Sequence, residues 1–303
     1  MTLILPSIAL LTEPRFIGNA APDDWYHRQI LEDDQLLQDA LAARGLPSVR
    51  LSWDDPTADW SAFSAAVFRT TWDYFDRFDQ FSAWFERVRN QTTLINPPDA
   101  LSWNMHKGYL EELSEKGVPV VPLRMIPAGS GHSLSGLLRE MGWSEGVIKP
   151  AISGGARLTY RIRPENAAEV EERLRPHLAR EDFLLQPFMP DILSTGEDSL
   201  MVLNGIVTHA VRKVAKPGDY RVQDDHGGSV HPHTATPDQT RLALHTLEAC
   251  GFNLSYARVD MVAGPDGAPL LMELEIIEPE LWLRLHPPSA EHFADAILER
   301  VGG

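Results

Sequence analysis

The stretch Tyr256-Ala-Arg-Val-Asp-Met-Val262 and its neighbour Leu270-Leu-Met-Glu-Leu-Glu-Ile276 decide the fold of this chain. In both stretches polar and apolar residues alternate, and side chains on a β-strand point alternately to its two faces. The turn sequence Gly264-Pro-Asp-Gly267 lies between them, so we predict a β-hairpin with one polar and one apolar face. Met272 belongs to the set expected on the apolar face.

Three carboxylates share the polar face of this predicted hairpin: Asp260 on the first strand, and Glu273 and Glu275 on the second. If Gly264 pairs with Pro269, Asp260 falls directly opposite Glu273, where like charges repel across roughly 5 Å. A cation would remove this repulsion, and oxygen-only ligands suit Mg²⁺ that is shared with the phosphates of a nucleotide. A solvated acidic face is the alternative interpretation of the same pattern.

The composition of the chain limits its partners. Its 303 residues predict about two domains. A formal net charge of −16 argues against a nucleic-acid partner and against an anionic membrane, because both are bound through basic residues. The single cysteine, Cys250, excludes an internal disulfide and a Cys-rich zinc site, and we interpret it as a buried, inert thiol. The apolar N-terminus lacks a basic region and is interpreted as a core strand of a cytoplasmic protein.

The first hundred residues alternate between strand and helix patterns, which predicts an open α/β sheet. The expected strands are residues 3–11, 48–52, 65–69 and 92–96, and the expected helices are residues 29–44 and 78–89.

Two further units follow. The second has expected helices at residues 103–116 and 165–177, and expected strands at 146–150, 157–163 and 183–186. The third has a hairpin of residues 199–204 and 206–212, a polar loop at 215–236 and a final helix at 289–301. Thr236-Pro-Asp-Gln239 predicts the start of another helix, with Thr at the N-cap, that ends at Gly251.

The sequence has no P-loop and no Rossmann glycine motif, so other residues must bind the phosphates of a nucleotide. Lys149 ends an apolar strand and precedes Ser153-Gly-Gly155, where glycines allow close approach of an anion to the backbone. Lys107 stands at the start of an expected helix, an unfavourable place for a cation unless an anion approaches. The residues from Leu184 to Met189 could offer backbone groups to adenine. The alternatives are two solvated lysines and a plain inter-domain hinge.

Taken in order, these elements resemble the ATP-grasp superfamily, from Lys107 to Glu275. Family members bind ATP between a small lid domain and a C-terminal domain. The resemblance therefore implies an α/β protein with an N-terminal open α/β domain at residues 1–101, a small α+β lid domain at 102–186 and a C-terminal α+β catalytic domain at 187–303. It also implies ATP and two Mg²⁺ ions as cofactors.

The resemblance also assigns ligand-binding roles. It implies nucleotide contacts from two lysines, the loop over the phosphates, the linker beside adenine and an acidic residue near the ribose: Lys107, Lys149, Ser153, Gly154, Gly155, Gln186, Pro187, Phe188, Met189 and Glu197. It implies Mg²⁺ ligation by Asp260, Glu273 and Glu275. Glu275 stands where the commoner family pattern has asparagine.

Within the superfamily, His209-Ala-Val-Arg-Lys213, Asp219-Tyr-Arg221 and His226-Gly-Gly228 resemble the ligase branch of glutathione synthetase and ribosomal-protein glutamate ligase. This implies a set that stabilises an acyl phosphate and a tetrahedral intermediate: Arg221, Arg212 or Lys213, and the backbone donors of Gly227 and Gly228. His226 is a candidate general base, with a merely solvated histidine as the alternative.

A narrower resemblance concerns the N-terminal part. Phe68-Arg-Thr-Thr-Trp-Asp-Tyr74, Asn96-Pro97, Trp103-Asn104 and Gly218-Asp-Tyr-Arg-Val-Gln223 are similar to the cyclo-ligases that form D-cycloserine from O-ureido-D-serine. Open α/β sheets bind ligands at the carboxyl ends of their strands. The implied substrate residues are Arg69, Thr71, Trp72, Asp73 and His226. A core tryptophan is the alternative interpretation of Trp72.

We therefore predict an ATP- and Mg²⁺-dependent ligase, which activates the carboxylate of a small amino-acid-like substrate as an acyl phosphate for attack by a nitrogen nucleophile. Intramolecular ring closure is the first interpretation, and intermolecular amino-acid ligation is the second. A kinase that phosphorylates a hydroxyl is a further alternative. The sequence leaves open whether the chain forms a homo-oligomer.

Overall fold

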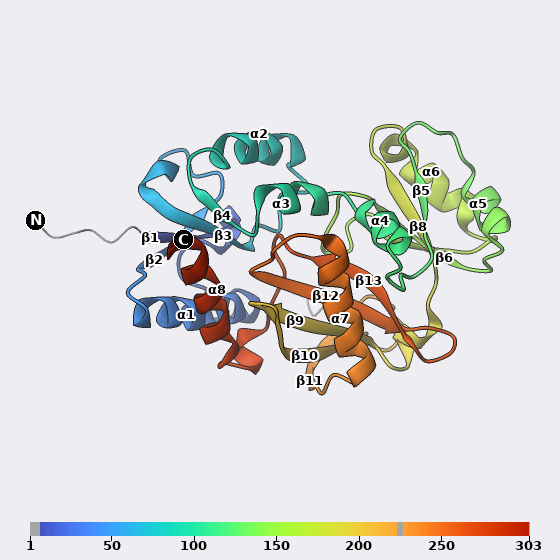
Figure 1. Ribbon diagram of the computed structural model, residues 1–303. Coiled ribbons are helices and arrows are strands. Elements are labelled where there is room, and N and C mark those ends of the chain that lie inside the picture. Colours follow the sequence, from blue (N-terminus) through green and yellow to red (C-terminus); the bar gives the residue numbers. More distant parts are fainter. Residues whose placement is uncertain (1–6, 223–226, 303) are drawn as a thin grey trace, which may run out of the picture.

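Three β-sheets build the protein, in a computed structural model that describes residues 7–222 and 227–302 (Figure 1). The N-terminal sheet is parallel, in the order β2-β1-β3-β4. Its strands are β1 (Ser7–Thr12), β2 (Ser48–Ser52), β3 (Phe63–Thr70) and β4 (Thr93–Ile95). The predicted open α/β sheet is therefore confirmed.

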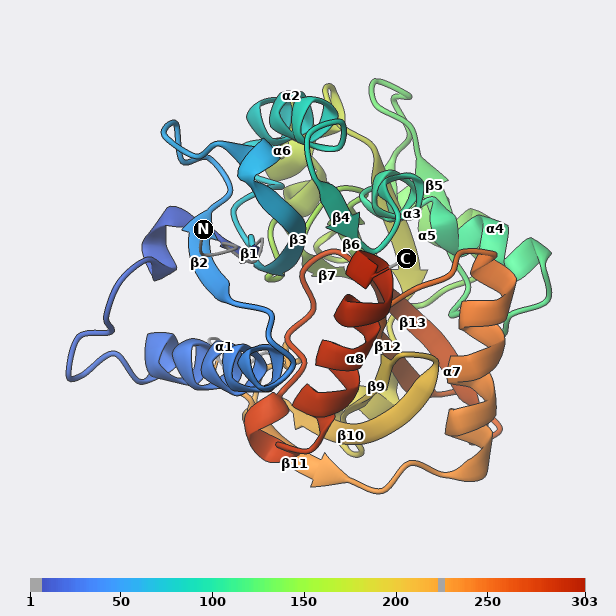
Figure 2. The same cartoon turned by 60° about the vertical axis from the view of Figure 1, so that its left-hand side comes forward.

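Alternation along β1 explains why helices cover both faces of the N-terminal sheet. Ile8 and Leu10 pack with α1 (Trp25–Ala43) and with α8 (Ser289–Gly302), which belongs to the far end of the chain. Figure 2 shows α1 and α8 side by side. Ala9 and Leu11 face the other way, into an aromatic cluster that includes residues of α2 (Phe78–Val88). Because both faces are apolar and covered, β1 is a continuous apolar run.

The middle sheet has the order β5-β8-β6-β7 and carries two helices. Its elements are β5 (Arg124–Ile126), α5 (Leu134–Met141), β6 (Gly146–Pro150), β7 (Tyr160–Ile162), α6 (Ala167–Leu178) and β8 (Phe183–Pro187). β7 is shorter than the predicted strand 157–163, because Ala156 and Leu158 have φ angles of +57° and +47°, which a strand cannot contain.

The C-terminal sheet has the order β11-β10-β9-β12-β13. Its strands are β9 (Glu197–Leu203), β10 (Ile206–Val214), β11 (Ser229–His233), β12 (Tyr256–Ala263) and β13 (Pro269–Glu275). β11 lies within the segment 215–236, so the prediction of one long loop there was wrong. α7 (Pro237–Cys250) begins with the predicted capping box of Thr236 and Gln239 and ends at Gly251.

The hairpin of β12 and β13 forms as predicted, with Asp260 paired to Glu273, but its register is set differently. The turn pairs Ala263, rather than Gly264, with Pro269, and a β-bulge at Met272 then restores the pairing of the carboxylates. The extra residue changes the face of Met272, which lines a cavity instead of entering the apolar core. Its predicted orientation was therefore wrong.

The predicted helix 103–116 is two helices, α3 (Pro98–Asn104) and α4 (Tyr109–Glu115). The side chain of Asn104 donates to the carbonyl of Leu274 (2.8 Å) and accepts from the amide of Ile276 (3.2 Å), which holds the end of α3 on β13. The amide of Lys107 donates to the carbonyl of Ala151 (2.8 Å) instead of continuing a helix. Lys107 therefore lies in the connector between the helices.

Asn96 joins the N-terminal sheet to the C-terminal sheet. Its amide nitrogen donates to the carbonyls of Tyr256 (2.9 Å) and Ile276 (2.8 Å), and its oxygen accepts from the amide of Ser255 (2.8 Å). The residue has a φ of +42°, in the left-handed region that asparagine tolerates better than most residues. We propose that residues 1–101, 102–186 and 187–303 are the domains that this joint and the connectors hold together.

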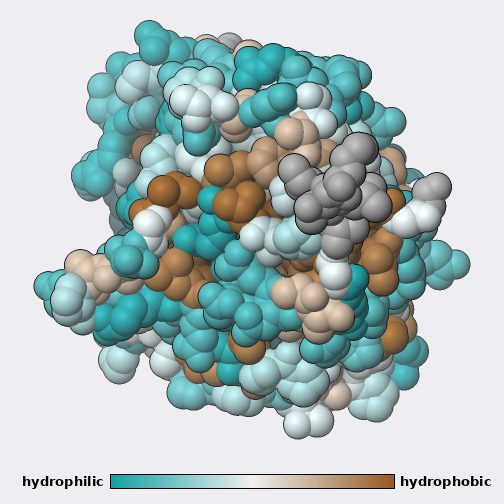
Figure 3. Space-filling model, turned by 90° about the vertical axis from the view of Figure 1, so that its left-hand side faces the viewer, coloured by the Kyte–Doolittle hydropathy of each residue, from teal (hydrophilic) through white to brown (hydrophobic). Residues whose placement is uncertain are grey.

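The face of the molecule in Figure 3 is largely hydrophilic, with a broken band of hydrophobic residues across its middle. Among the helices of residues 7–222 and 227–302, none is both long and apolar enough to cross a membrane.

We expect the free energy of unfolding to fall as the pH drops from about 6.5 to 4, because of His209 on β10. This ring lies 2.8 Å from the carbonyl oxygen of Leu281 and 2.8 Å from the hydroxyl of Ser289. Burial lowers the pKa of His209 to about 4, whereas the unfolded chain takes up the proton near 6.5. The unfolded state therefore binds protons first, and the folded state loses up to about 3 kcal/mol of stability across this interval.

Urea unfolding at several pH values checks this expectation. His209→Gln should flatten the pH dependence between 6.5 and 4, whereas His231→Gln, at an exposed histidine on β11, should leave it unchanged. Equal slopes for the wild type and His209→Gln would contradict the assignment.

Candidate active site

A cavity of about 570 Å³ lies where the three sheets meet. Its walls come from the connectors of the N-terminal sheet, from the middle sheet and its glycine loop, and from the polar face of the C-terminal sheet. The alternation of β12 and β13 directs their carboxylates into this space and their apolar residues into the core below. The polar face of the predicted hairpin is therefore the floor of the cavity.

Glu273 lies between two lysines from different parts of the fold. Lys107 forms an ion pair with one oxygen of Glu273 and donates to the carbonyl of Ser153 (2.8 Å). Lys149, on β6, lies 3.6 Å from the other oxygen. Burial alone would raise the pKa of Glu273, but the two lysines outweigh it and hold that pKa at about 2. All three groups are thus charged and placed together before any ligand arrives.

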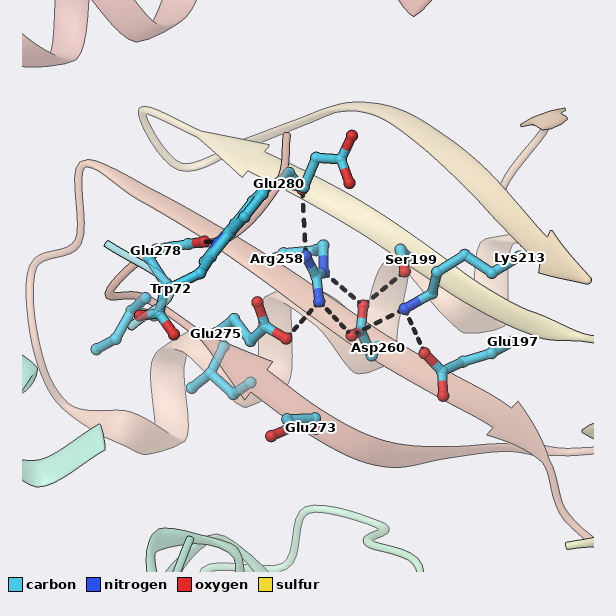
Figure 4. Close-up of polar contacts among 12 residues, drawn as sticks. Trp72, Glu197, Ser199, Lys213, Arg258, Asp260, Glu273, Glu275, Glu278 and Glu280 are labelled. Carbon is cyan, nitrogen blue, oxygen red and sulfur yellow. Dashed lines mark hydrogen bonds and ion pairs between the residues drawn. The ribbon is translucent and has the colours of Figure 1, made fainter. Parts of the chain in front are cut away.

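Asp260 is the centre of a second cluster, which Figure 4 shows. It accepts from Ser199 (2.6 Å), from Arg258 (2.9 Å to each oxygen) and from Lys213 (3.1 Å). Lys213 is also paired with Glu197. Burial opposes ionisation, but Arg258 and Lys213 hold the pKa of Asp260 well below its usual range.

Glu275 completes the predicted metal-binding set and is paired with Arg258. Burial raises the pKa of Glu275 to about 7, and Asp260 and Glu273 add to this against the attraction of Arg258. In the described part of the chain, no three metal-ligating side chains converge on one point. The three carboxylates all line the cavity and offer oxygen ligands that suit Mg²⁺. These carboxylates can bind a metal if nucleotide binding rearranges their ion pairs. The metal would then replace the basic side chains on the carboxylates, and phosphate would pair with the basic side chains that are released.

The predicted adenine linker lines one end of the cavity. Gln186, Pro187, Phe188 and Met189 all contribute to its wall. The side-chain nitrogen of Gln186 is buried and has no hydrogen-bond partner within the described residues. A buried amide without a hydrogen-bond partner costs free energy. A polar group of a ligand could remove this cost by accepting a hydrogen bond from Gln186.

The predicted phosphate loop also lines the cavity, through Ser153, Gly154 and Gly155. The hydroxyl of Ser153 donates to the carbonyl of Pro150 (2.9 Å), which shapes the start of the loop. A Cβ atom on Gly154 would lie 2.6 Å from the ring of Phe75 in the N-terminal part. Gly154 therefore permits the loop to pack against that part.

Only some of the residues predicted to act on the acyl phosphate line the cavity. Lys213 and Arg221 line the cavity, and Arg221 holds Asp219 by two hydrogen bonds of 3.1 and 2.8 Å. Arg212 does not line it, because neighbouring side chains on β10 face opposite ways, and it binds Asp198 instead (2.7 and 2.8 Å). Of the two predicted alternatives, the structure therefore brings Lys213 to the cavity and not Arg212. Gly227 and Gly228 are also absent from the wall, and His226 lies outside the described residues.

Of the predicted substrate residues on β3 and after it, Trp72 lines the cavity. Arg69 lies inside the N-terminal part, paired with Asp34 (3.0 Å). Asp73 is turned to Trp53 (2.7 Å) and to Arg77, and Thr71 is fully buried. The structure therefore does not bring Arg69, Thr71 and Asp73 to the wall of the cavity.

Sequence reasoning missed several residues of the wall. Arg258 could have been found, because the alternation of β12 places it on the face of Asp260. Tyr26 lies in the first turn of α1, before the predicted start of that helix. The others come from segments between the main helices and strands, which carry no periodic signal: Arg15, Phe75, Asp76, Arg157, Tyr220, Glu278, Glu280 and Trp282.

Residues 8–96 match the N-terminal domain of the D-cycloserine synthetase DcsG, and residues 163–279 match the RimK-like ATP-grasp domain. The chain is 31% identical over 283 residues to the cycloserine biosynthesis protein DcsG of Streptomyces lavendulae, covering 88% of this chain and 92% of that one.

The chain belongs to the DcsG family of ATP-grasp ligases.

Solved structures agree. The crystal structure of D-cycloserine synthetase DcsG superposes with a TM-score of 0.83 at 29% identity, over 97% of this chain and 99% of that chain. D-alanine–D-alanine ligase from Bacillus anthracis shares the fold, with a TM-score of 0.66 at 14% identity, over 98% and 97%. The protein is thus an ATP-dependent, ADP-forming ligase that activates a carboxylate for attack by a nitrogen nucleophile, as predicted.

Glu273→Gln should destabilise the ligand-free protein, because it leaves Lys107 and Lys149 buried near each other without their counter-charge. Removing one partner of a buried ion pair costs about 3 kcal/mol or more. ADP should recover more stability in this variant than in the wild type, since phosphate would supply the missing negative charge to the lysines.

Thermal unfolding with and without ADP tests both expectations. Glu169→Gln, at an exposed glutamate of α6, should leave the transition unchanged. An unaltered transition for Glu273→Gln would show that the two lysines do not depend on Glu273.

Proposed function

We propose that this ligase closes a ring within one small amino-acid-like substrate, with O-ureido-D-serine as the first candidate. The observation that carries the proposal is the match to DcsG along both parts of the chain, the N-terminal domain as well as the ATP-grasp domain. The N-terminal part supplies Tyr26, Trp72 and Phe75 to the cavity wall, so the matching region includes the side where the substrate would lie. The cavity volume is within the usual range of about 300–1,000 Å³ for small-molecule sites.

The proposed nucleotide site keeps the predicted residues. Lys107 and Lys149 hold the phosphates under the loop Ser153–Gly155. Adenine lies along the linker from Gln186 to Met189, and Glu197 serves the ribose side. Asp260, Glu273 and Glu275 would hold two Mg²⁺ ions, whose charge would neutralise that of the transferring phosphoryl group.

The proposed chemistry has two steps. An oxygen of the substrate carboxylate attacks the γ-phosphorus of ATP, and the bond from that phosphorus to the bridging oxygen breaks, which releases ADP and gives an acyl phosphate. A nitrogen of the same substrate then attacks the carbonyl carbon. The carbon–oxygen bond to phosphate breaks, phosphate leaves, and the nitrogen loses its proton to water.

The protein's own groups would accelerate both steps by position and charge. Lys213, Arg221 and Arg258 line the cavity beside the carboxylate floor, where preorganised cations stabilise the developing negative charge on oxygen. Fixing the nitrogen and the carbonyl carbon in one molecule and one pocket removes most of the entropy cost of their encounter.

Intermolecular coupling of an amine to the carboxylate is the second candidate. It is favoured by the match of residues 163–279 to the RimK-like domain and by the fold shared with D-alanine–D-alanine ligase. The nucleotide end of the cavity would be the same, and only the source of the nitrogen would differ.

Phosphate release from Mg-ATP decides between these reactions, measured with a panel of amino acids, ureido acids and diamino acids, singly and in pairs. We expect release with O-ureido-D-serine alone, with mass spectrometry showing a cyclic product. Release only with pairs would replace ring closure by coupling. A product heavier by a phosphoryl group, with ADP but no free phosphate, would indicate a kinase and contradict both.

A further inference from the structure

The acidic residues of the cavity wall are not equally paired. Seven of them line the cavity, and six form ion pairs with basic side chains. Those six are Asp76, Glu197, Asp260, Glu273, Glu275 and Glu280. Glu278 is the exception, because no basic side chain within the described residues forms an ion pair with it. Among residues 7–222 and 227–302, Glu278 is therefore the lining carboxylate without an ion-pair partner.

Glu278 is held in place through its backbone. The indole nitrogen of Trp72 donates to its carbonyl oxygen (2.9 Å), which ties the segment after β13 to the N-terminal part. Figure 4 shows Glu278 beside Trp72 and next to Glu275, at the end of the site away from Lys213. Burial raises the pKa of Glu278 well above its usual range, and Glu275 adds to this. A cation from outside would favour the ionised form.

Two aromatic rings line the cavity beside Glu278. They are Trp72, which binds its backbone, and Tyr26, whose ring centroid lies 6.0 Å from that of Trp72. The faces of aromatic rings attract cations, especially ammonium groups that have lost part of their water. The surroundings of Glu278 therefore favour an organic cation over an anion.

Neighbouring carboxylates are already engaged. Glu275 is paired with Arg258. Glu280 is paired with Arg284 (2.8 Å), and Arg284 is in turn held by Asp33 (2.9 Å). Among the described residues, Glu278 is thus the lining carboxylate that a substrate cation can bind without displacing a basic side chain.

The two ends of the cavity complement a zwitterion. Lysines and arginines lie over the carboxylate floor, where the substrate carboxylate would be activated, and Glu278 lies at the aromatic end. Resting on the function proposed above, we infer that Glu278 binds the ammonium group of the substrate and makes the enzyme specific for free amino acids over the corresponding des-amino acids. It is a specificity-determining residue rather than a metal ligand.

Calorimetric titration of the full-length protein tests this, with Mg-ADP present. The probes are O-ureido-D-serine and 3-(ureidooxy)propanoate, which lacks only the amino group. The wild type should prefer the first by about tenfold or more, the size of a charge-assisted hydrogen bond. Glu278→Gln should reduce this preference to about twofold or less, with unchanged affinity for Mg-ADP. Glu291→Gln, at an exposed glutamate of α8, should keep it.

Three results would overturn the inference: an unchanged preference in Glu278→Gln, equal weakening of both probes, or loss of Mg-ADP binding, which would indicate a metal ligand. If Glu278→Gln does not fold, Trp72→Phe removes the hydrogen bond that positions Glu278 and should reduce the same preference.

A different set of results would show that the proposed function is wrong. If the wild type binds neither probe and releases no phosphate with O-ureido-D-serine, ring closure of that substrate is wrong. D-serine and 3-hydroxypropanoate then replace the pair. A wild type that binds D-serine no better than 3-hydroxypropanoate overturns the role of Glu278 as well.

Discussion

The position of Glu273 between Lys107 and Lys149 is the interaction on which the site depends. Glu273 belongs to the C-terminal sheet, Lys149 to the middle sheet, and Lys107 to the connector before α4. Two buried lysines would repel each other without a carboxylate between them. One side chain therefore fixes how the glycine loop and the middle sheet lie over the floor of the cavity.

The same reasoning applies to the whole cavity. Its cations and carboxylates neutralise each other, which offsets part of the free-energy cost of removing so many charges from water. A nucleotide with Mg²⁺ brings both signs of charge, and can take over the lysines and the carboxylates together. Binding then replaces ion pairs within the protein by ion pairs with the ligand, and it adds no unpaired charge to the buried site. In the proposal above, Glu278 is the group that binds the cation of the substrate.

The N-terminal part is a structural partner of the site as well as one of its walls. Asn96 binds three backbone groups at the ends of β12 and β13, and Trp72 binds the carbonyl of Glu278. Residues that end β3 were good candidates for substrate contacts on general grounds. Arg69 and Asp73 instead bind within the N-terminal part, because buried charges need partners wherever they lie.

The sequence by itself determined the carboxylate hairpin, because the alternation of a few residues encodes it. The resemblance of its motifs identified the family and predicted the roles of Lys107, Lys149 and the linker from Gln186 to Met189. Only the tertiary structure decided that Met272 bulges toward the cavity, that Lys107 leaves its helix and that the Glu278 side chain forms no ion pair within residues 7–222 and 227–302. These outcomes depend on contacts between residues far apart in the chain. Local periodicity carries no information about such contacts, since they are set by packing and by the pairing of buried charges.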